Sequence, residues 1–306
     1  MDEREPELTG PRRFRTPDRR HRRIRLAVAA AVALGVLGVA GWAGASLLRD
    51  DPPPPPPTET APPLARLRVI FPEGFTRAEM ADRVAAVREI AIERRNVTPR
   101  LTRAGYVRAS ASAVPPAAFR KHVKRRSIEG FLFPATYEFS QYTTAAKLVR
   151  DQLEHFRRQW GRVNMRYARS KSLTPYDVLI IASMVEKETV VPAERRLVAA
   201  VVYNRLRLRM PLGIDATIRY GRNVPGTEPL KRSDLETDHP YNTRKRLGLP
   251  PTPISNPGLA SMRAAANPAR VDYLYFVRRG SSNRHFFTAS EAEFCQKSLE
   301  YGFGGC

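Results

Sequence analysis

The chain has 306 residues, enough for one large domain or two modest ones with a hydrophobic core. Its 52 Lys and Arg against 30 Asp and Glu give a formal net charge of +22 at pH 7, which favours an anionic partner: a nucleic acid, an acidic surface or an anionic polymer. The five histidines and two cysteines show neither Cys-x-x-Cys nor His-Glu-x-x-His spacing, so we expect no metal and no cofactor.

The N-terminal residues predict a membrane anchor. A basic tail, residues 1–25, precedes 23 residues without a charged side chain, Leu26–Leu48, which are long enough as a helix to cross a hydrocarbon core of about 30 Å. Asp50 and Asp51 follow, so the positive-inside rule puts the tail in the cytoplasm and the remainder outside the cell membrane. The alternative is a cleaved signal peptide, because Ala43–Ala45 offers small residues near a cleavage site.

Both alternatives export the body of the chain. Leu64–Cys306 contains 42 Lys and Arg against 22 Asp and Glu, an excess of +20. An exported protein does not meet nucleic acid, so cell-wall polymers or the anionic face of the cytoplasmic membrane are the expected partners. In an oxidising compartment Cys295 and Cys306 predict a disulfide, with two free thiols as the alternative.

A proline-rich linker, residues 49–63, is expected to hold the body away from the membrane as a polyproline II spacer. Residues 64–123 then predict a small α+β module. It starts with a strand at Leu67–Phe71, followed by a helix that Thr76 and Glu79 open as a capping box.

Residues 124–306 predict a mixed α+β domain. The segment 210–257 is rich in Pro, Gly, Asn and Asp, and its aromatic residues argue against disorder, so we expect it to wrap an extended ligand. The other expected elements are an extended segment at Glu129–Phe139, helices over Thr144–Arg169, Thr174–Glu188, Ala193–Arg209 and Leu259–Ala266, strands at Tyr273–Arg278 and His285–Thr288, and a closing helix from Ser290.

The helix that follows Thr174 ends in two carboxylates and is the main candidate for chemistry. One apolar stripe leads to Glu188 and a second leads to Glu186, so periodicity does not rank the two acids. Two positions correspond to a rotation of about 200°, so the acids cannot work as a pair on one face. Burial of either carboxyl predicts the raised pKa that a general acid needs near neutral pH; two solvated acids at a fraying helix end are the alternative.

An amide on the next helix adds a second candidate. Asn204 shares an apolar face with Leu197, Val201 and Leu208. A buried amide needs hydrogen-bond partners, so Asn204 is either a structural residue or part of a cleft beside Glu188.

Read together, the motifs resemble the YceG-like family of endolytic murein lytic transglycosylases. The similarity runs from about Val69 onward, in one order and with compatible spacing. The matching residues are Glu129–Pro134, Ala182–Thr189, Tyr203–Leu206, Asp215 with Thr217 and Tyr220, Leu235–Thr237, Pro240–Thr243, Gly248–Pro251, Pro253–Ile254 with Asn256–Gly258, Tyr273–Val277, and His285 with Phe287–Thr288.

The resemblance implies an α+β, single-pass membrane protein with a LysM-like module ahead of its catalytic domain. It implies a lyase that cleaves the glycan strands of peptidoglycan and leaves 1,6-anhydro-N-acetylmuramic ends. The family's catalytic carboxylate is the second glutamate of Glu-Lys-Glu, which maps onto Glu188, with Glu186 as a supporting acid. The glycan-binding LysM-like module maps onto Val69–Glu93. Coupling to wall synthesis also follows, which makes peptidoglycan synthases candidate partners.

We expect the substrate cleft to include Asn204, Asp215, Tyr241 and Asn242. Four residues depart from the usual family pattern: Ala135, Gly213, Ile214 and Ala216. Two alternatives to the lytic reaction remain open. One is a hydrolytic muramidase, in which Asp215 supplies the second carboxylate, and the other is a non-catalytic, membrane-tethered scaffold that binds peptidoglycan.

Overall fold

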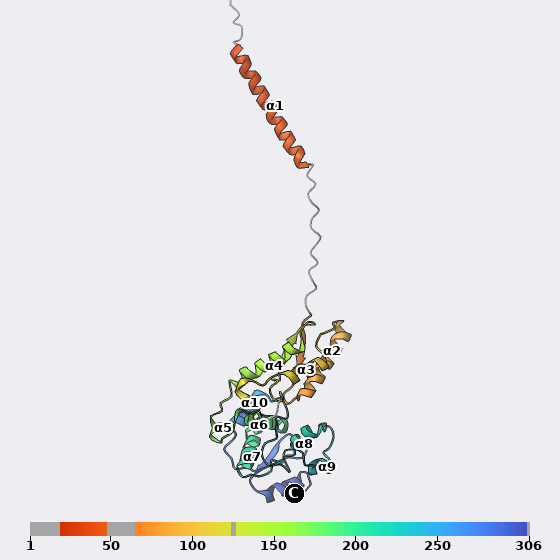
Figure 1. Ribbon diagram of the computed structural model, residues 1–306, viewed down its shortest axis with the longest axis vertical. Helices are drawn as coiled ribbons and strands as arrows, with labels where there is room; N and C mark the ends of the chain where they lie inside the picture. Colours follow the sequence, from red (N-terminus) through yellow and green to blue (C-terminus); the bar gives the residue numbers. More distant parts are fainter. Residues whose placement is uncertain (1–18, 48–64, 124–126, 305–306) are drawn as a thin grey trace, which may run out of the picture. The chain divides into compact units, whose positions relative to one another are not determined.

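The computed structural model describes residues 19–47, 65–123 and 127–304. The chain forms two compact units, Met1–Pro62 and Pro63–Cys306. In the first unit, helix α1 (Arg19–Leu47) includes every residue of the expected span Leu26–Leu48 except the last (Figure 1). Leu48 lies outside the described residues. Within the described ranges, no helix combines the length and the apolar character needed to cross a membrane.

The second unit opens with a strand, two helices and a strand that returns to the first. β1 pairs antiparallel with β2, with Leu67 opposite Phe139 and Ile70 opposite Thr136. This pairing ties residues on both sides of position 123 into one sheet. The elements of this part are β1 (Leu67–Ile70), α2 (Arg77–Arg95), α3 (Arg103–Ser112), the 3-10 helix η1 (Ala117–Phe119), β2 (Thr136–Phe139) and α4 (Ala145–Trp160).

Local capping signals fix where the helices begin. The capping box of Thr76 and Glu79 at the start of α2 is confirmed: each side chain accepts a hydrogen bond from the other residue's backbone N–H. Thr174 and Asp177 form the same motif at the start of α6 (Pro175–Glu188). Both expected helix starts are therefore present.

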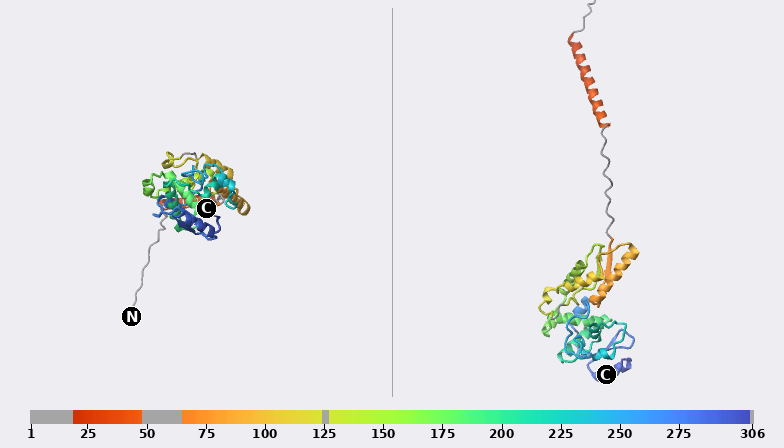
Figure 2. Two further views of the ribbon diagram at one scale, coloured as in Figure 1. Left: turned by 90° about the horizontal axis from the view of Figure 1, so that it is seen from below. Right: turned by 45° about the vertical axis from the view of Figure 1, so that its right-hand side comes forward.

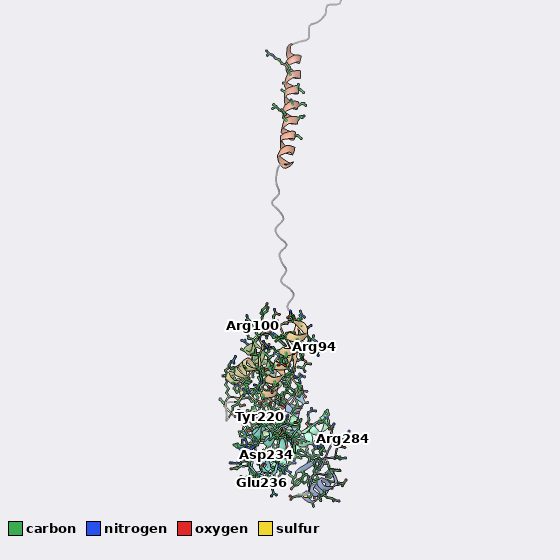
Figure 3. The ribbon with its side chains drawn as sticks, turned by 90° about the vertical axis from the view of Figure 1, so that its right-hand side faces the viewer. Arg94, Arg100, Tyr220, Asp234, Glu236 and Arg284 are labelled. Carbon is green, nitrogen blue, oxygen red and sulfur yellow. The ribbon has the colours of Figure 1, made fainter. Side chains whose placement is uncertain are left out.

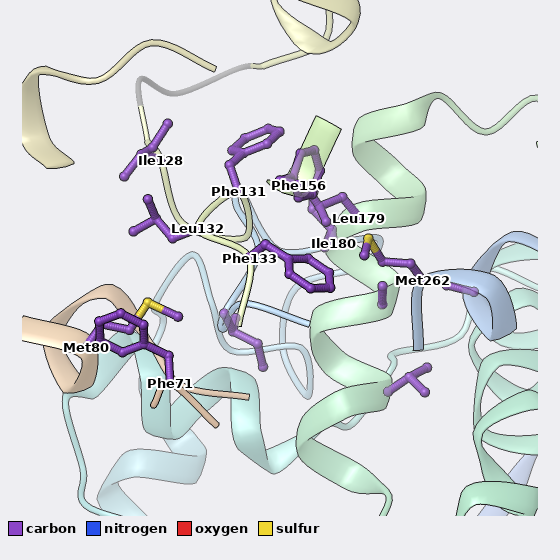
Figure 4. Close-up of a cluster of buried hydrophobic side chains, with 14 of the residues drawn as sticks. Phe71, Met80, Ile128, Phe131, Leu132, Phe133, Phe156, Leu179, Ile180 and Met262 are labelled. Carbon is purple, nitrogen blue, oxygen red and sulfur yellow. The ribbon is translucent and has the colours of Figure 1, made fainter. Parts of the chain in front are cut away.

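Helix α6 lies at the centre of the second unit. Val178 to Val185 are buried without a break, so the helix is apolar on every side, as expected for one enclosed by the fold. It packs against α7 (Arg195–Arg207) and α10 (Leu259–Ala266). In Figure 4 its Leu179 and Ile180 lie among the buried Phe131, Phe133 and Met262 of other segments.

The expected single helix over Thr144–Arg169 is wrong, because the chain breaks it. α4 ends at Trp160, and α5 (Arg166–Ser170) starts after a turn in which the Asn164 side chain accepts a hydrogen bond from the backbone N–H of Arg166 at 2.9 Å. Gly161 and Asn164 favour this turn over a continued helix.

The remaining elements lie mostly in the later half of the unit. Figure 2 shows the orange to yellow-green elements gathered in one half and the green to blue ones in the other. These elements are the 3-10 helix η2 (Pro192–Glu194), α8 (Asp215–Arg222), α9 (Arg232–Glu236), the antiparallel pair β3 (Tyr275–Arg278) and β4 (His285–Thr288), and α11 (Glu291–Glu300).

The expected disulfide is only partly within the described residues. Cys295 is disulfide-bonded, whereas Cys306 lies outside the described residues, so their pairing stays a prediction.

Gly130 lies in the segment before β2, packed against Pro253 and Leu179. Its φ is +88°, and a Cβ there comes within 2.7 Å of the Pro253 ring. We expect Gly130→Ala to destabilise the protein by about 2–4 kcal/mol, because alanine pays both for the left-handed backbone conformation and for the steric overlap with Pro253. Thermal unfolding of the full chain measures this, with Gly226→Ala as control, since no atom lies within 4 Å of that added Cβ. Equal melting temperatures for the two variants would contradict the prediction.

Candidate active site

A cavity of about 1200 Å³ lies beside the C-terminal end of α6. Its wall also includes the start of α2, the end of α3, the residues around Glu129, α8 with the loop that follows it, and the segment at Tyr241. Of the residues expected in the site, the cavity brings together Glu188, Asp215 and Tyr241. In the part of the chain that the structure describes, no group of three or more His, Cys, Asp or Glu side chains could hold a metal ion.

Glu188 is the last residue of α6, and its side chain is partly buried. The pKa of the Glu188 carboxyl is raised to about 7, first by burial and second by the negative charge of Asp215. The backbone N–H of Ala216, which donates a hydrogen bond to Glu188, and the charges of Arg244 and Lys187 act in the opposite direction. Near neutral pH this carboxyl can therefore both give and take a proton.

Asp215 and Arg244 form an ion pair at the edge of the cavity. The Arg244 Nη2 lies 2.7 Å from the Asp215 Oδ1, and both side chains are about half exposed. Asp215 is the first residue of α8, where a negative charge interacts favourably with the helix dipole. The pair places one charge of each sign next to Glu188.

Glu129 is a second buried carboxyl in the same cavity, with 4% of its surface exposed. Its oxygens accept hydrogen bonds from the Arg77 backbone N–H at 3.0 and 3.2 Å, the Asn256 amide at 2.8 Å and the Tyr220 hydroxyl at 3.2 Å. Burial raises the pKa of Glu129 to about 7, although these donors lower it. We did not predict Glu129 as a site residue; an acid inside an aromatic, turn-rich segment is the signal that could have identified it.

Two tyrosines form an aromatic wall next to Glu129. The rings of Tyr220 and Tyr241 lie 5.2 Å apart, and the Tyr241 hydroxyl lies 2.7 Å from the Thr252 hydroxyl. In Figure 3 Tyr220 lies in the middle of the unit, between Arg94 and Arg100 on one side and Asp234 and Glu236 on the other. The wall thus belongs to the region where the two halves of the unit meet.

Glu186 has a different environment, although it is only two residues from Glu188. It does not line the cavity, and 5% of its side chain is exposed. Its Oε2 accepts a hydrogen bond from the Gly258 N–H at 2.8 Å, and its Oε1 lies 3.6 Å from Arg195. Glu186 therefore ties the end of α6 to the loop before α10 and to α7.

The two expected amides do not line this cavity. Asn204 donates to the carbonyls of Val271 and Tyr273, both at 2.9 Å, so it fastens α7 to the segment before β3. Asn242 is fully buried and donates to the carbonyls of Leu235 and Thr237 at 2.9 and 2.7 Å. Both amides are satisfied by the backbone, which explains why polar residues occur at these positions.

Two of the positions that depart from the family pattern have a local explanation. Gly213 has a φ of +66°, which favours glycine, and its N–H donates to the Thr243 carbonyl at 3.0 Å. Ala216 meets Glu188 through its backbone N–H, which any residue other than proline supplies. Nothing in the structure explains Ala135.

The chain is similar to one known protein family in both sequence and structure. A sequence profile described as the YceG-like family matches residues 57–299. The chain belongs to the YceG-like family. A crystal structure of a YceG-like protein from Listeria monocytogenes superimposes with a TM-score of 0.64 and 28% sequence identity, covering 74% of each chain.

Two curated proteins that are similar in sequence to this YceG-like chain are both named endolytic murein transglycosylase. An endolytic murein transglycosylase of Bacillus subtilis is 34% identical over 183 residues, which cover 60% of this chain and 50% of the relative. A protein with the same name from Streptococcus pneumoniae is 33% identical over 184 residues, covering 58% of this chain and 33% of the relative. The chain thus spans a third to a half of the curated relatives it matches.

Proposed function

We propose that the chain is an endolytic murein lytic transglycosylase in which Glu188 is the only catalytic acid and base. The observation that carries the proposal is a partly buried carboxyl with a pKa of about 7 at the wall of a large cavity. Membership of the YceG-like family and relatives named endolytic murein transglycosylases support the same reaction.

The reaction needs one carboxyl because the substrate supplies its own nucleophile. Glu188 first donates its proton to the glycosidic oxygen while the bond from that oxygen to the anomeric carbon of N-acetylmuramic acid breaks. The acetamido oxygen of the same sugar stabilises the positive charge that develops on the anomeric carbon. Glu188 then removes the proton of the 6-hydroxyl, whose oxygen bonds to the anomeric carbon. No water is consumed, in contrast to a hydrolase with two carboxylates.

The neighbouring groups have distinct tasks in this proposal. The N–H of Ala216 stabilises the Glu188 carboxylate after it has given up its proton, and Asp215 keeps that carboxyl protonated beforehand. Tyr220 and Tyr241 offer ring surface for the sugars, and Glu129 fixes the Tyr220 hydroxyl.

The proposal also includes how the enzyme is held in the wall. Leu26–Leu48 anchors the chain in the cytoplasmic membrane with its basic tail inside, and residues 49–63 act as spacer. The strand–helix–helix–strand part that begins at β1 serves as the LysM-like module and holds glycan. Peptidoglycan synthases are the proposed protein partners, since a cut in a growing strand acts on their product.

Product analysis tests the reaction. The purified full chain, in detergent, is incubated with peptidoglycan, and the released ends are identified by mass spectrometry. We expect 1,6-anhydro ends, which are lighter than hydrated ends by one water. Hydrated reducing ends would overturn the lytic assignment in favour of the muramidase, and an intact polymer would favour the non-catalytic scaffold.

The pH dependence of the reaction reports on Glu188. Because Glu188 must be protonated to act first as an acid, and its pKa is raised to about 7, we expect kcat/KM to fall as the pH rises through about 7. Asp215→Asn should move this fall to lower pH, since a charge that raises the pKa is lost. Arg244→Gln should move it to higher pH, because Arg244 lowers the pKa. Shifts of the two variants in the same direction would contradict the assignment.

A further inference from the structure

A second cavity, of about 920 Å³, lies along the N-terminal part of α6. The α5 and α7 helices and the segments 249–251 and 268–272 complete its wall, and none of its lining residues lines the Glu188 cavity. Tyr176, in this wall, and Glu188 are twelve positions apart, which is about 18 Å along the helix. The space is thus a separate site, of a size typical of ligand pockets.

Three cations around this cavity have no carboxylate partner in the described part of the chain: Lys171, Arg207 and Arg270. Arg270 lies with its guanidinium 3.4 Å from the centre of the Tyr167 ring, and it donates to the Pro268 carbonyl at 3.1 Å. Of the two acids in the wall, Asp177 is occupied by the cap of α6. The charges that remain available are three positive ones and Asp272, which favours a ligand with more carboxylates than amines.

The apolar part of the wall fits small aliphatic groups better than sugar rings. Leu173, Ile180 and the adjoining prolines supply apolar surface. The Tyr167 ring is already covered by Arg270 and stacks on Tyr203 at 6.0 Å, so these rings are committed to the protein. A sugar binds preferentially to a free aromatic face, whereas the methyl groups of a peptide need only apolar contact.

Tyr176 adds a polar requirement. Its side chain is 1% exposed, and its hydroxyl has no hydrogen-bond partner among the described residues. Buried tyrosine hydroxyls are normally paired, and burial raises the pKa of this one, so it stays a neutral donor. A ligand that settles against this wall can bring the missing acceptor, such as a peptide carbonyl or carboxylate oxygen.

We propose that this cavity binds a short peptide with more carboxylates than amines, namely a stem peptide of peptidoglycan. The identity of the peptide rests on the proposed function, whereas the charge and polarity of the site do not. Because the cavity is about 18 Å from Glu188 along α6, the bound peptide belongs to a position of the polymer away from the bond that is cut. The site would favour cleavage of strands that still carry their peptides.

Calorimetric titration of the full chain in detergent tests the proposal. The probe is the synthetic peptide N-acetyl-L-Ala-γ-D-Glu-L-Lys-D-Ala-D-Ala, whose blocked N-terminus leaves the Lys ammonium as its amine beside the carboxylates of D-Glu and of the C-terminus. We expect binding to weaken by about tenfold or more when Lys171→Gln and Arg207→Gln are combined, and by about tenfold in Tyr176→Phe. Tyr176→Phe should keep or raise the melting temperature, because it removes an unpaired buried hydroxyl. Arg169→Gln, an exposed cation outside the lining, is the matched control and should bind as the wild type does.

Three results would overturn the proposal: no binding by the wild type, equal affinity in the double variant, or displacement of the peptide by an N-acetylglucosamine tetramer. Glu188→Gln should bind the peptide unchanged, because Glu188 lies in the other cavity. A protein that cleaves glycan without binding the peptide overturns this inference alone. One that binds the peptide and leaves glycan intact overturns the proposed function alone.

Discussion

Glu188→Gln is expected to lower the rate of glycan cleavage by about a thousandfold or more while leaving the fold intact. In the proposed mechanism the same carboxyl donates a proton in the first step and removes one in the second, and each proton transfer is typically worth about 10²–10⁴ in rate. Glutamine keeps the shape of the side chain and can still accept from the Ala216 N–H, but it does neither transfer. Anhydro ends released per minute from peptidoglycan measure the loss.

Glu186→Gln is the matched control. Glu186 lies outside the cavity, so we expect its loss to act on stability rather than on the chemical step. Glutamine can still accept from the Gly258 N–H but loses the charge that faces Arg195, at a cost of about 1–2 kcal/mol. A melting temperature close to the wild type's, combined with loss of cleavage, would exchange the roles of the two acids.

Local signals in the sequence are sufficient to predict much of the fold. Helix starts depend on contacts within one turn, so Thr76 with Glu79 and Thr174 with Asp177 are readable from spacing alone. The uninterrupted apolar run of α6 predicts a buried helix, because a helix that is apolar on every side must be enclosed by the fold. The pairing of β1 with β2 spans some 70 residues, and no local pattern specifies it.

The site is less predictable because it is assembled from distant segments. Helical periodicity leads equally to Glu186 and Glu188; only the positions of Gly258, Arg195 and Asp215 around them separate the two acids. Asn204 interrupts an apolar stripe, and this pattern is the same for a residue that lines a cleft and for an amide that bonds to the backbone. Its partners are carbonyls some 67 and 69 residues away.

Glu129 shows most clearly what the sequence conceals, since one carboxyl joins three segments. Its oxygens meet the first N–H of α2, the amide of Asn256 and the hydroxyl of Tyr220 on α8. The Asn256 amide also donates to the Phe75 carbonyl at 2.9 Å, so the loop before α10 and the turn before α2 meet at this point. The acid thus connects the part that begins at β1 with the wall of the cavity that Glu188 lines.

Glu129→Ala is therefore expected to destabilise the protein by about 2–4 kcal/mol and to reduce cleavage as well. The substitution leaves the N–H of Arg77 and the Tyr220 hydroxyl without their acceptor inside the fold, and each unpaired buried group costs about 1–3 kcal/mol. Glu129→Gln should destabilise the protein less than Glu129→Ala, because its carbonyl oxygen can still accept a hydrogen bond from the Arg77 N–H. Some stability is still lost, since its NH2 group faces the donors of Asn256 and Tyr220. Melting temperature and cleavage rate of the full chain are compared for both variants.

Tyr220→Phe separates the two effects of Glu129. It removes one donor to the carboxyl and keeps the aromatic wall, so the melting temperature should change by less than in Glu129→Ala. If Glu129 acts on catalysis by fixing Tyr220, cleavage by Tyr220→Phe falls as far as cleavage by Glu129→Gln, and the double variant falls no further, since coupled residues are not additive. Independent, multiplying losses would mean that Glu129 meets the substrate itself, and that the cavity holds a second working carboxyl as a hydrolase requires.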